Sequence, residues 1–145
     1  MKRINILILL SSILFFNACS NRNDLDDIVA NEFEKCPEQS NNCVVDFSKI
    51  MKFEWDTMYY FSGANSLEDI KKELGFSYNQ WEDIGDRVIF LNKGKIVYQK
   101  YWFSNPSEEL KGVVFATDLK TFKVDKSNAK FKIREQGKAF YLEKL

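Results

Sequence analysis

The sequence contains no histidine, and its 21 basic and 21 acidic residues leave a formal net charge of zero. The lack of histidine removes the commonest general base and a common metal ligand. The zero net charge gives no overall field that would attract nucleic acid. The sequence also has no glycine-rich phosphate loop, no Ser-His-Asp arrangement and no internal repeat. These absences predict a protein without a metal site, a cofactor or a nucleic-acid partner.

One long apolar run is present, at the start of the chain. Lys2 and Arg3 precede the run Ile4–Phe16, which is too short to cross the roughly 30 Å apolar core of a bilayer as a helix. A short basic segment followed by such a run is typical of a secretory signal peptide. The first 18 residues are therefore predicted to direct export and to be removed.

The end of this leader, Phe16-Asn17-Ala18-Cys19, resembles the lipobox of bacterial lipoproteins. The resemblance implies cleavage between Ala18 and Cys19 and acylation of the Cys19 thiol. Phe16 and Asn17 differ from the leucine and the small residue that are usual there, and the alternative is an ordinary signal peptide cut after Ala18. Ser20 resembles the outer-membrane sorting signal of enterobacterial lipoproteins. We expect a membrane partner through the lipid anchor and a location in the cell envelope, with the outer membrane favoured.

The other two cysteines, Cys36 and Cys43, enclose a segment of turn-forming residues. An even pair in an exported chain predicts a disulfide. Residues 24–35 place apolar side chains at helical spacing, although a solvated linker is the alternative. The expected organisation is a leader over 1–18, a tether and disulfide-closed loop over 19–43, and one globular domain over 44–145.

The stretch 53–76 carries the clearest structural pattern. Aromatic residues predict a strand over 53–61, and the helix that follows over 66–74 has Asn65 or Ser66 as its candidate N-cap. Leu67, Ile70 and Leu74 form one apolar stripe, and Gly75 is placed to end the helix in a left-handed conformation.

The remaining sequence predicts antiparallel strands. Residues 87–91 and 96–103 flank a short loop with asparagine and glycine, which indicates a β-hairpin. Residues 130–134 alternate, with Phe131 and Ile133 expected in the core and Lys130, Lys132 and Arg134 in water. The predicted fold is one α+β domain, mostly a single antiparallel sheet with the 66–74 helix on one face and one core. Residues 44–103, with the order VDFSKIMKFEWDTMYYF, turn and helix, resemble small bacterial envelope proteins of unknown activity.

Candidate functional residues are few. Trp55, Tyr98, Tyr101 and Trp102 are candidates for an aromatic binding surface, with packing in the core as the alternative. The candidate acid–base groups are the carboxylates of Glu54, Asp56, Glu82, Asp83 and Asp86. Their spacing selects no catalytic pair.

Charge is distributed unevenly along the chain. Residues 111–145 carry nine basic and four acidic side chains, and residues 19–50 carry three and seven. The C-terminal strands present either an ordinary solvated face or a basic face for lipid headgroups. The function expected is a non-catalytic envelope lipoprotein that binds a protein partner or assists an assembly. The alternative is a small-ligand or lipid-binding protein with an apolar cavity between helix and sheet.

Overall fold

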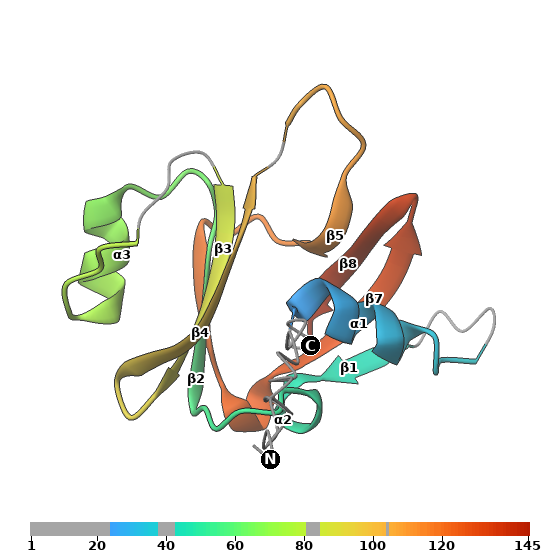
Figure 1. Ribbon diagram of the computed structural model, residues 1–145, viewed down its shortest axis with the longest axis horizontal. Helices are drawn as coiled ribbons and strands as arrows, with labels where there is room; N and C mark the ends of the chain where they lie inside the picture. The colour runs from blue at the N-terminus through green and yellow to red at the C-terminus, as the bar shows by residue number, and fades with distance from the viewer. Residues whose placement is uncertain (1–23, 38–42, 81–84, 104) are drawn as a thin grey trace, which may run out of the picture.

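The computed structural model describes residues 24–37, 43–80, 85–103 and 105–145 (Figure 1). The helices are α1 (Leu25–Phe33), α2 (Phe47–Ile50) and α3 (Leu67–Leu74), with a short 3₁₀ helix at Lys126–Asn128. The strands are β1 (Val44–Asp46), β2 (Thr57–Phe61), β3 (Gly85–Asn92), β4 (Lys95–Phe103), β5 (Lys111–Phe115), β6 (Thr121–Asp125), β7 (Lys130–Gln136) and β8 (Lys138–Lys144).

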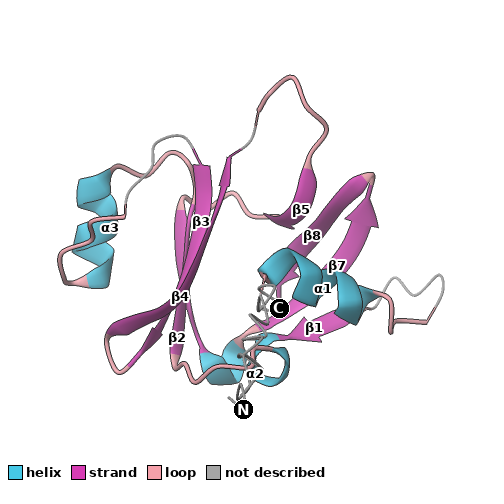
Figure 2. Cartoon of the chain, viewed as in Figure 1, coloured by secondary structure: helices cyan, strands magenta, loops and turns pink. Residues whose placement is uncertain are grey.

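These strands form two sheets, and the prediction of a single sheet is wrong (Figure 2). The central sheet has the order β4-β3-β2-β6, and the C-terminal sheet has the order β1-β7-β8-β5. All pairs are antiparallel except β5 with β8, which are parallel. The mostly-β α+β class is as predicted.

The division into two sheets comes from the turn after β6. Asp125-Lys126-Ser127-Asn128 has the composition of a hairpin turn, but Lys126–Asn128 forms a 3₁₀ helix. This turn leads the chain out of the central sheet, where β6 pairs with β2, and into the C-terminal sheet, where β7 pairs with β1 and β8. Turn composition shows where a strand ends and does not show whether the next strand pairs with it or faces it.

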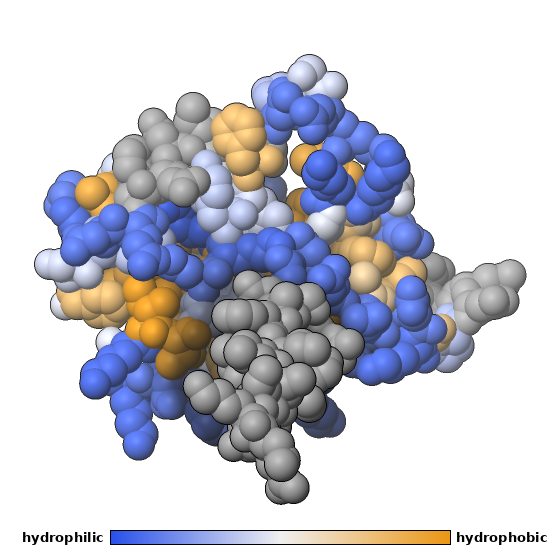
Figure 3. Space-filling view, viewed as in Figure 1, coloured by the Kyte–Doolittle hydropathy of each residue, from blue (hydrophilic) through white to orange (hydrophobic). Residues whose placement is uncertain are grey.

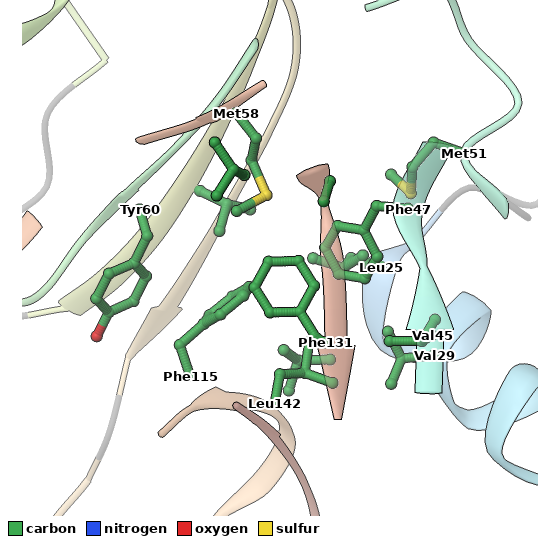
Figure 4. Packing of buried hydrophobic residues seen from close by; sticks show 14 of the residues in the cluster. Leu25, Val29, Val45, Phe47, Met51, Met58, Tyr60, Phe115, Phe131 and Leu142 are labelled. Atoms are coloured by element: carbon green, nitrogen blue, oxygen red, sulfur yellow. The ribbon is translucent and has the colours of Figure 1, made fainter. Parts of the chain in front are cut away.

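The main core lies between the sheets (Figure 4). Met58 and Tyr60 enter it from β2, and Phe131 enters it from β7, with Phe131 fully buried. Leu25 and Val29 of α1 are also fully buried in this core. Helix α1, predicted as part of a tether, therefore packs together with residues 44–145 in one unit.

A second cluster lies on the other face of the central sheet, beneath α3. Because β2 is covered on both faces, its side chains alternate between the two clusters, with Tyr59 and Phe61 under the helix. The prediction of one common core is therefore wrong. The predicted strand over 53–61 is shorter than expected and begins at Thr57.

Helix α3 matches the predicted helix closely. Ser66 is the N-cap and exchanges hydrogen bonds with Asp69 in a capping box, and Gly75 ends the helix with φ of 76°. Asn65, the other candidate cap, is buried and donates from its side chain to the Lys120 carbonyl at 2.7 Å.

Replacing Leu74 with alanine is expected to lower the free energy of unfolding by about 2 kcal/mol. Leu74 is buried in the α3 cluster near its edge, which places the loss at the low end for a leucine. Urea unfolding measures it, with the exposed Glu73 changed to alanine as the control. A loss below about 0.5 kcal/mol, typical of a surface site, would show that α3 does not pack on the sheet.

The predicted disulfide is present between Cys36 and Cys43, whose Cα atoms are 5.7 Å apart. This separation lies within the usual range for a disulfide. The bond joins the end of α1 to the start of β1 and closes a loop with a sequence separation of 7.

Changing both Cys36 and Cys43 to serine is expected to reduce stability by about 2–3 kcal/mol, because the open loop gains entropy in the unfolded chain. Urea unfolding with and without a thiol reductant measures the effect. The reductant should destabilise the wild type and leave the double variant unchanged. Equal stability of the wild type under both conditions would contradict the prediction.

Candidate functional site

The four predicted surface aromatics lie in different places. Trp55 is buried in the main core and packs edge-to-face on Phe90, with ring centroids 5.0 Å apart. Its assignment to a surface is therefore wrong. Tyr98, Tyr101 and Trp102 are half-buried on β4, at the edge of the central sheet.

Tyr98, Lys100 and Trp102 share one face of β4 and hold the start of α1. The Leu25 backbone N–H donates to the Tyr98 hydroxyl at 3.0 Å. The Trp102 indole N–H donates to Asp26 Oδ1 at 2.9 Å. Lys100 Nζ pairs with Asp26 Oδ2 at 2.7 Å and also with Asp24. We call Asp24, Asp26, Tyr98, Lys100 and Trp102 the α1 clasp.

The clasp also reaches the other sheet. The Val113 backbone N–H of β5 donates to Asp26 Oδ1 at 2.8 Å. Gly112 leaves room for this carboxylate, because a Cβ atom there would lie 2.6 Å from Asp26 Oδ2. Asp26 therefore connects α1 with an edge strand of each sheet.

The electrostatics of the clasp favour the charged lysine. Burial lowers the pKa of Lys100, but its hydrogen bonds to Asp24 and Asp26 outweigh burial and leave the pKa above its ordinary value of 10.5. Burial raises the pKa of Tyr98. At neutral pH, Lys100 therefore stays a charged ammonium and Tyr98 stays a neutral phenol. These are the forms that the contacts of the clasp require.

An open groove of about 420 Å³ lies beside the clasp. Its walls are the end of β4, the β4–β5 connection and the start of β5, and Asp26 and Lys100 of the clasp also line it. Two large apolar side chains stand open at this groove: Phe103 is 63% exposed and Leu110 is 42% exposed. Figure 3 shows apolar atoms gathered where β4 ends, next to the polar β4–β5 connection.

Four carboxylates line this groove, those of Asp26, Asp86, Glu108 and Glu109. Glu108 accepts a hydrogen bond from the Asn105 side-chain amide at 3.0 Å, and Glu109 pairs with Lys138. The two aspartates are engaged in structural hydrogen bonds. Asp26 accepts from Trp102 and Val113 as described. Asp86 accepts from the Tyr60 hydroxyl and from the Gly63 backbone N–H, each at 2.9 Å. Burial and the Asp86 carboxylate raise the pKa of Tyr60, so Tyr60 remains a proton donor to Asp86. These groups hold strands and turns together and form no acid–base pair.

The other predicted carboxylates are also structural, exposed or outside the described residues. Asp56 accepts a hydrogen bond from the Lys93 backbone N–H at 2.6 Å and so supports the β3–β4 hairpin turn. In that turn, Lys93 and Gly94 both have positive φ, as a two-residue hairpin loop requires. Glu54 is exposed. Glu82 and Asp83 lie outside the described residues.

The stability contributed by Asp56 is expected to depend on pH. The Lys93 N–H holds the pKa of Asp56 below its ordinary value of 3.8 in the folded protein. A lowered folded-state pKa means that the contribution is present above about pH 4 and is lost as the pH falls below this value. Asp56→Asn should therefore destabilise the protein at pH 7 and have less effect at pH 3, as measured by urea unfolding. An equal effect at the two pH values would contradict this role.

The C-terminal sheet tests the predicted basic face. Phe131 and Ile133 are buried, and Lys130 and Arg134 are exposed, as the alternation predicts. Two acidic residues share this outer face, because Asp46 is the strand partner of Lys130 and Glu143 that of Lys132. The compensated charges favour an ordinary solvated face.

The predicted lipidation and cleavage residues, Cys19 and Ala18, lie outside the described residues. Within the described ranges, no helix is long and apolar enough to cross a membrane. The same ranges contain no group of three or more acidic or cysteine side chains placed to hold a metal ion.

Comparison of the chain with protein-family models, curated proteins and solved structures gives no match. The case for function therefore depends on the groove and on the sequence. Four residues of this site were missed from the sequence: Asp26, Lys100, Phe103 and Leu110. The sequence gives one local signal for these residues, which is the run Lys100–Phe103 ahead of a polar loop. The contacts of the clasp have no local signal, because they join residues 76 positions apart.

Proposed function

We propose that this chain is a lipid-anchored protein of the bacterial envelope that acts by contact and not by catalysis, with the β4–β5 groove as its contact surface. The lipobox-like sequence ending in Cys19 supports the anchor. The observation that carries the contact surface is the exposure of Phe103 and Leu110 at one open groove. Large apolar side chains grouped on a surface are typical of sites where another molecule binds.

The chemistry of the groove supports contact over catalysis. Its two aspartates and Lys100 already have partners on neighbouring elements. A catalytic acid or base needs a side chain that can meet a substrate proton, and these side chains serve the fold instead.

The alternative of a ligand cavity between helix and sheet has less support. Ile70 is fully buried and Leu74 is buried against a cluster that includes Phe61 and Ile89. Side chains therefore fill the space beneath α3 that such a ligand would occupy.

Thiol protection in isolated envelopes tests this proposal. An acylated Cys19 and the Cys36–Cys43 disulfide would leave an introduced cysteine as the sole free thiol. Lys111→Cys places this thiol at the groove, and Lys95→Cys places a matched thiol at the far end of β4. Both lysines are exposed.

A membrane-impermeant maleimide should label Lys111→Cys several-fold more slowly in envelopes than after detergent extraction. It should label Lys95→Cys at similar rates in both. Equal labelling of Lys111→Cys in the two states would mean that nothing covers the groove, and the proposed contact surface would be wrong.

A further inference from the structure

We infer that the groove faces the membrane that holds the anchor, and that Phe103 and Leu110 rest in the headgroup region of the bilayer. This inference rests on the lipid anchor proposed above. It names the lipid surface as the partner of the groove.

The chain between the anchor and the fold is short. Only residues 20–23 separate Cys19 from Asp24. Five Cα-to-Cα steps reach at most about 18 Å even when fully extended. The acylated residue therefore lies within about 18 Å of Asp24, whatever path the chain takes.

Asp24 is fixed on the body of the protein. Asp24 pairs with Lys100, and the next residue, Leu25, donates its backbone N–H to Tyr98. Leu25 is also fully buried. Because the fold begins at this point, residues of α1 cannot lengthen the tether unless the contacts of the clasp break.

The tether is also short compared with the domain. A domain of this length has a radius of gyration of about 14 Å, which corresponds to a sphere about 36 Å across. The tether is about half of that diameter, so Asp24 cannot lie on the side far from the membrane. Lys100 and Asp26, two members of the same clasp, also line the groove, so the groove lies next to the residue that the tether keeps near the membrane.

The rim of the groove carries two exposed apolar side chains, Phe103 and Leu110. An aromatic ring and a leucine side chain are suited to the boundary between headgroups and acyl chains. The rim has both signs of charge: Glu108 and Glu109 stand beside Lys111, and Glu109 pairs with Lys138 at 3.1 Å. The whole groove lining carries four acidic and two basic side chains, so the contact is expected to be apolar and not to require anionic lipid.

The test uses the acylated protein in vesicles of phosphatidylcholine alone. A polarity-sensitive dye on Lys111→Cys should shift its emission to shorter wavelength and be quenched by brominated phosphatidylcholine. The same dye on Lys95→Cys should show neither effect. Adding Phe103→Ser to Lys111→Cys should reduce the quenching at least two-fold, whereas Leu119→Ser should not. Phe103 and Leu119 are matched in exposure, at 63% and 59%, and Leu119 is not among the groove residues.

The outcomes separate this inference from the proposed function. Protection of Lys111→Cys in envelopes, without quenching in vesicles, would mean that a protein covers the groove and would overturn the lipid contact alone. Failure of both experiments would remove the contact surface together with the inference. Quenching that appears only when anionic lipid is added would also contradict the inference, because it would indicate a basic surface.

Discussion

Replacing Phe131 with alanine is expected to lower the free energy of unfolding by about 4 kcal/mol. Phe131 is fully buried on β7, between the two sheets. Measured between centroids, its ring lies 4.8 Å from that of Phe47 on α2 and 6.4 Å from that of Phe122 on β6 of the central sheet. The substitution removes a ring that these neighbours surround and leaves a cavity where the two sheets meet.

Urea unfolding of the soluble chain measures this loss, and Phe103→Ala is the matched control. It deletes the same atoms from a side chain that is 63% exposed, so its effect should stay within about 0.5 kcal/mol. Similar losses for the two variants would contradict the packing of the main core between the two sheets.

Replacing Asp26 with alanine is expected to cost about 3 kcal/mol, the second largest effect. One carboxylate accepts from Trp102 and Val113 and pairs with Lys100. Its loss leaves the two N–H donors without this acceptor. It also leaves the Lys100 ammonium, whose side chain is only 15% exposed, with Asp24 as its remaining partner.

Two further variants separate the clasp from general effects on α1. Asp27→Ala changes an exposed residue in the same helical turn and should change stability by less than about 0.5 kcal/mol. Asp26→Asn keeps an oxygen acceptor and loses the charge, so it should fall between the wild type and Asp26→Ala. A cost for Asp26→Ala no larger than that for Asp27→Ala would show that the clasp does not hold α1 to the sheets.

The sequence predicts well those elements whose signals are local. Helix α3 carries its cap, its apolar stripe and its terminal glycine within ten residues, and the structure places them as predicted. The β3–β4 hairpin follows from a two-residue turn whose backbone is left-handed at both positions. The Cys36–Cys43 disulfide follows from cysteine count and spacing. In each case, the residues that decide the structure are neighbours in the chain.

The prediction of one sheet is wrong because alternation shows only that one face of a strand is buried. Phe131 and Ile133 are buried as predicted, but the core that they enter also takes side chains from a second sheet. The buried position of Trp55 has a similar cause. Its neighbour Asp56 supports the hairpin turn, and Trp55 packs against Phe90. Neither contact has a local signal.

The groove is the feature least predictable from the sequence, because residues far apart in the chain form it. Its clasp joins the start of α1 to the end of β4, across 76 positions of sequence. The acidic residues near α1 have the composition of a solvated linker, and only the folded chain shows that Asp26 pairs with Lys100. The exposure of Phe103 likewise depends on where the β4–β5 connection leaves the sheet.

The most direct test of the account is the intact mass and membrane partition of the full-length protein beside a Cys19→Ser variant. We expect the wild type to be cleaved before Cys19, to carry the mass of its acyl chains and to sediment with membranes. The variant should lack the acyl mass and should not sediment with membranes to the same extent. A wild type that is cleaved, unacylated and free of membranes would contradict the anchor, and with it the membrane-facing groove.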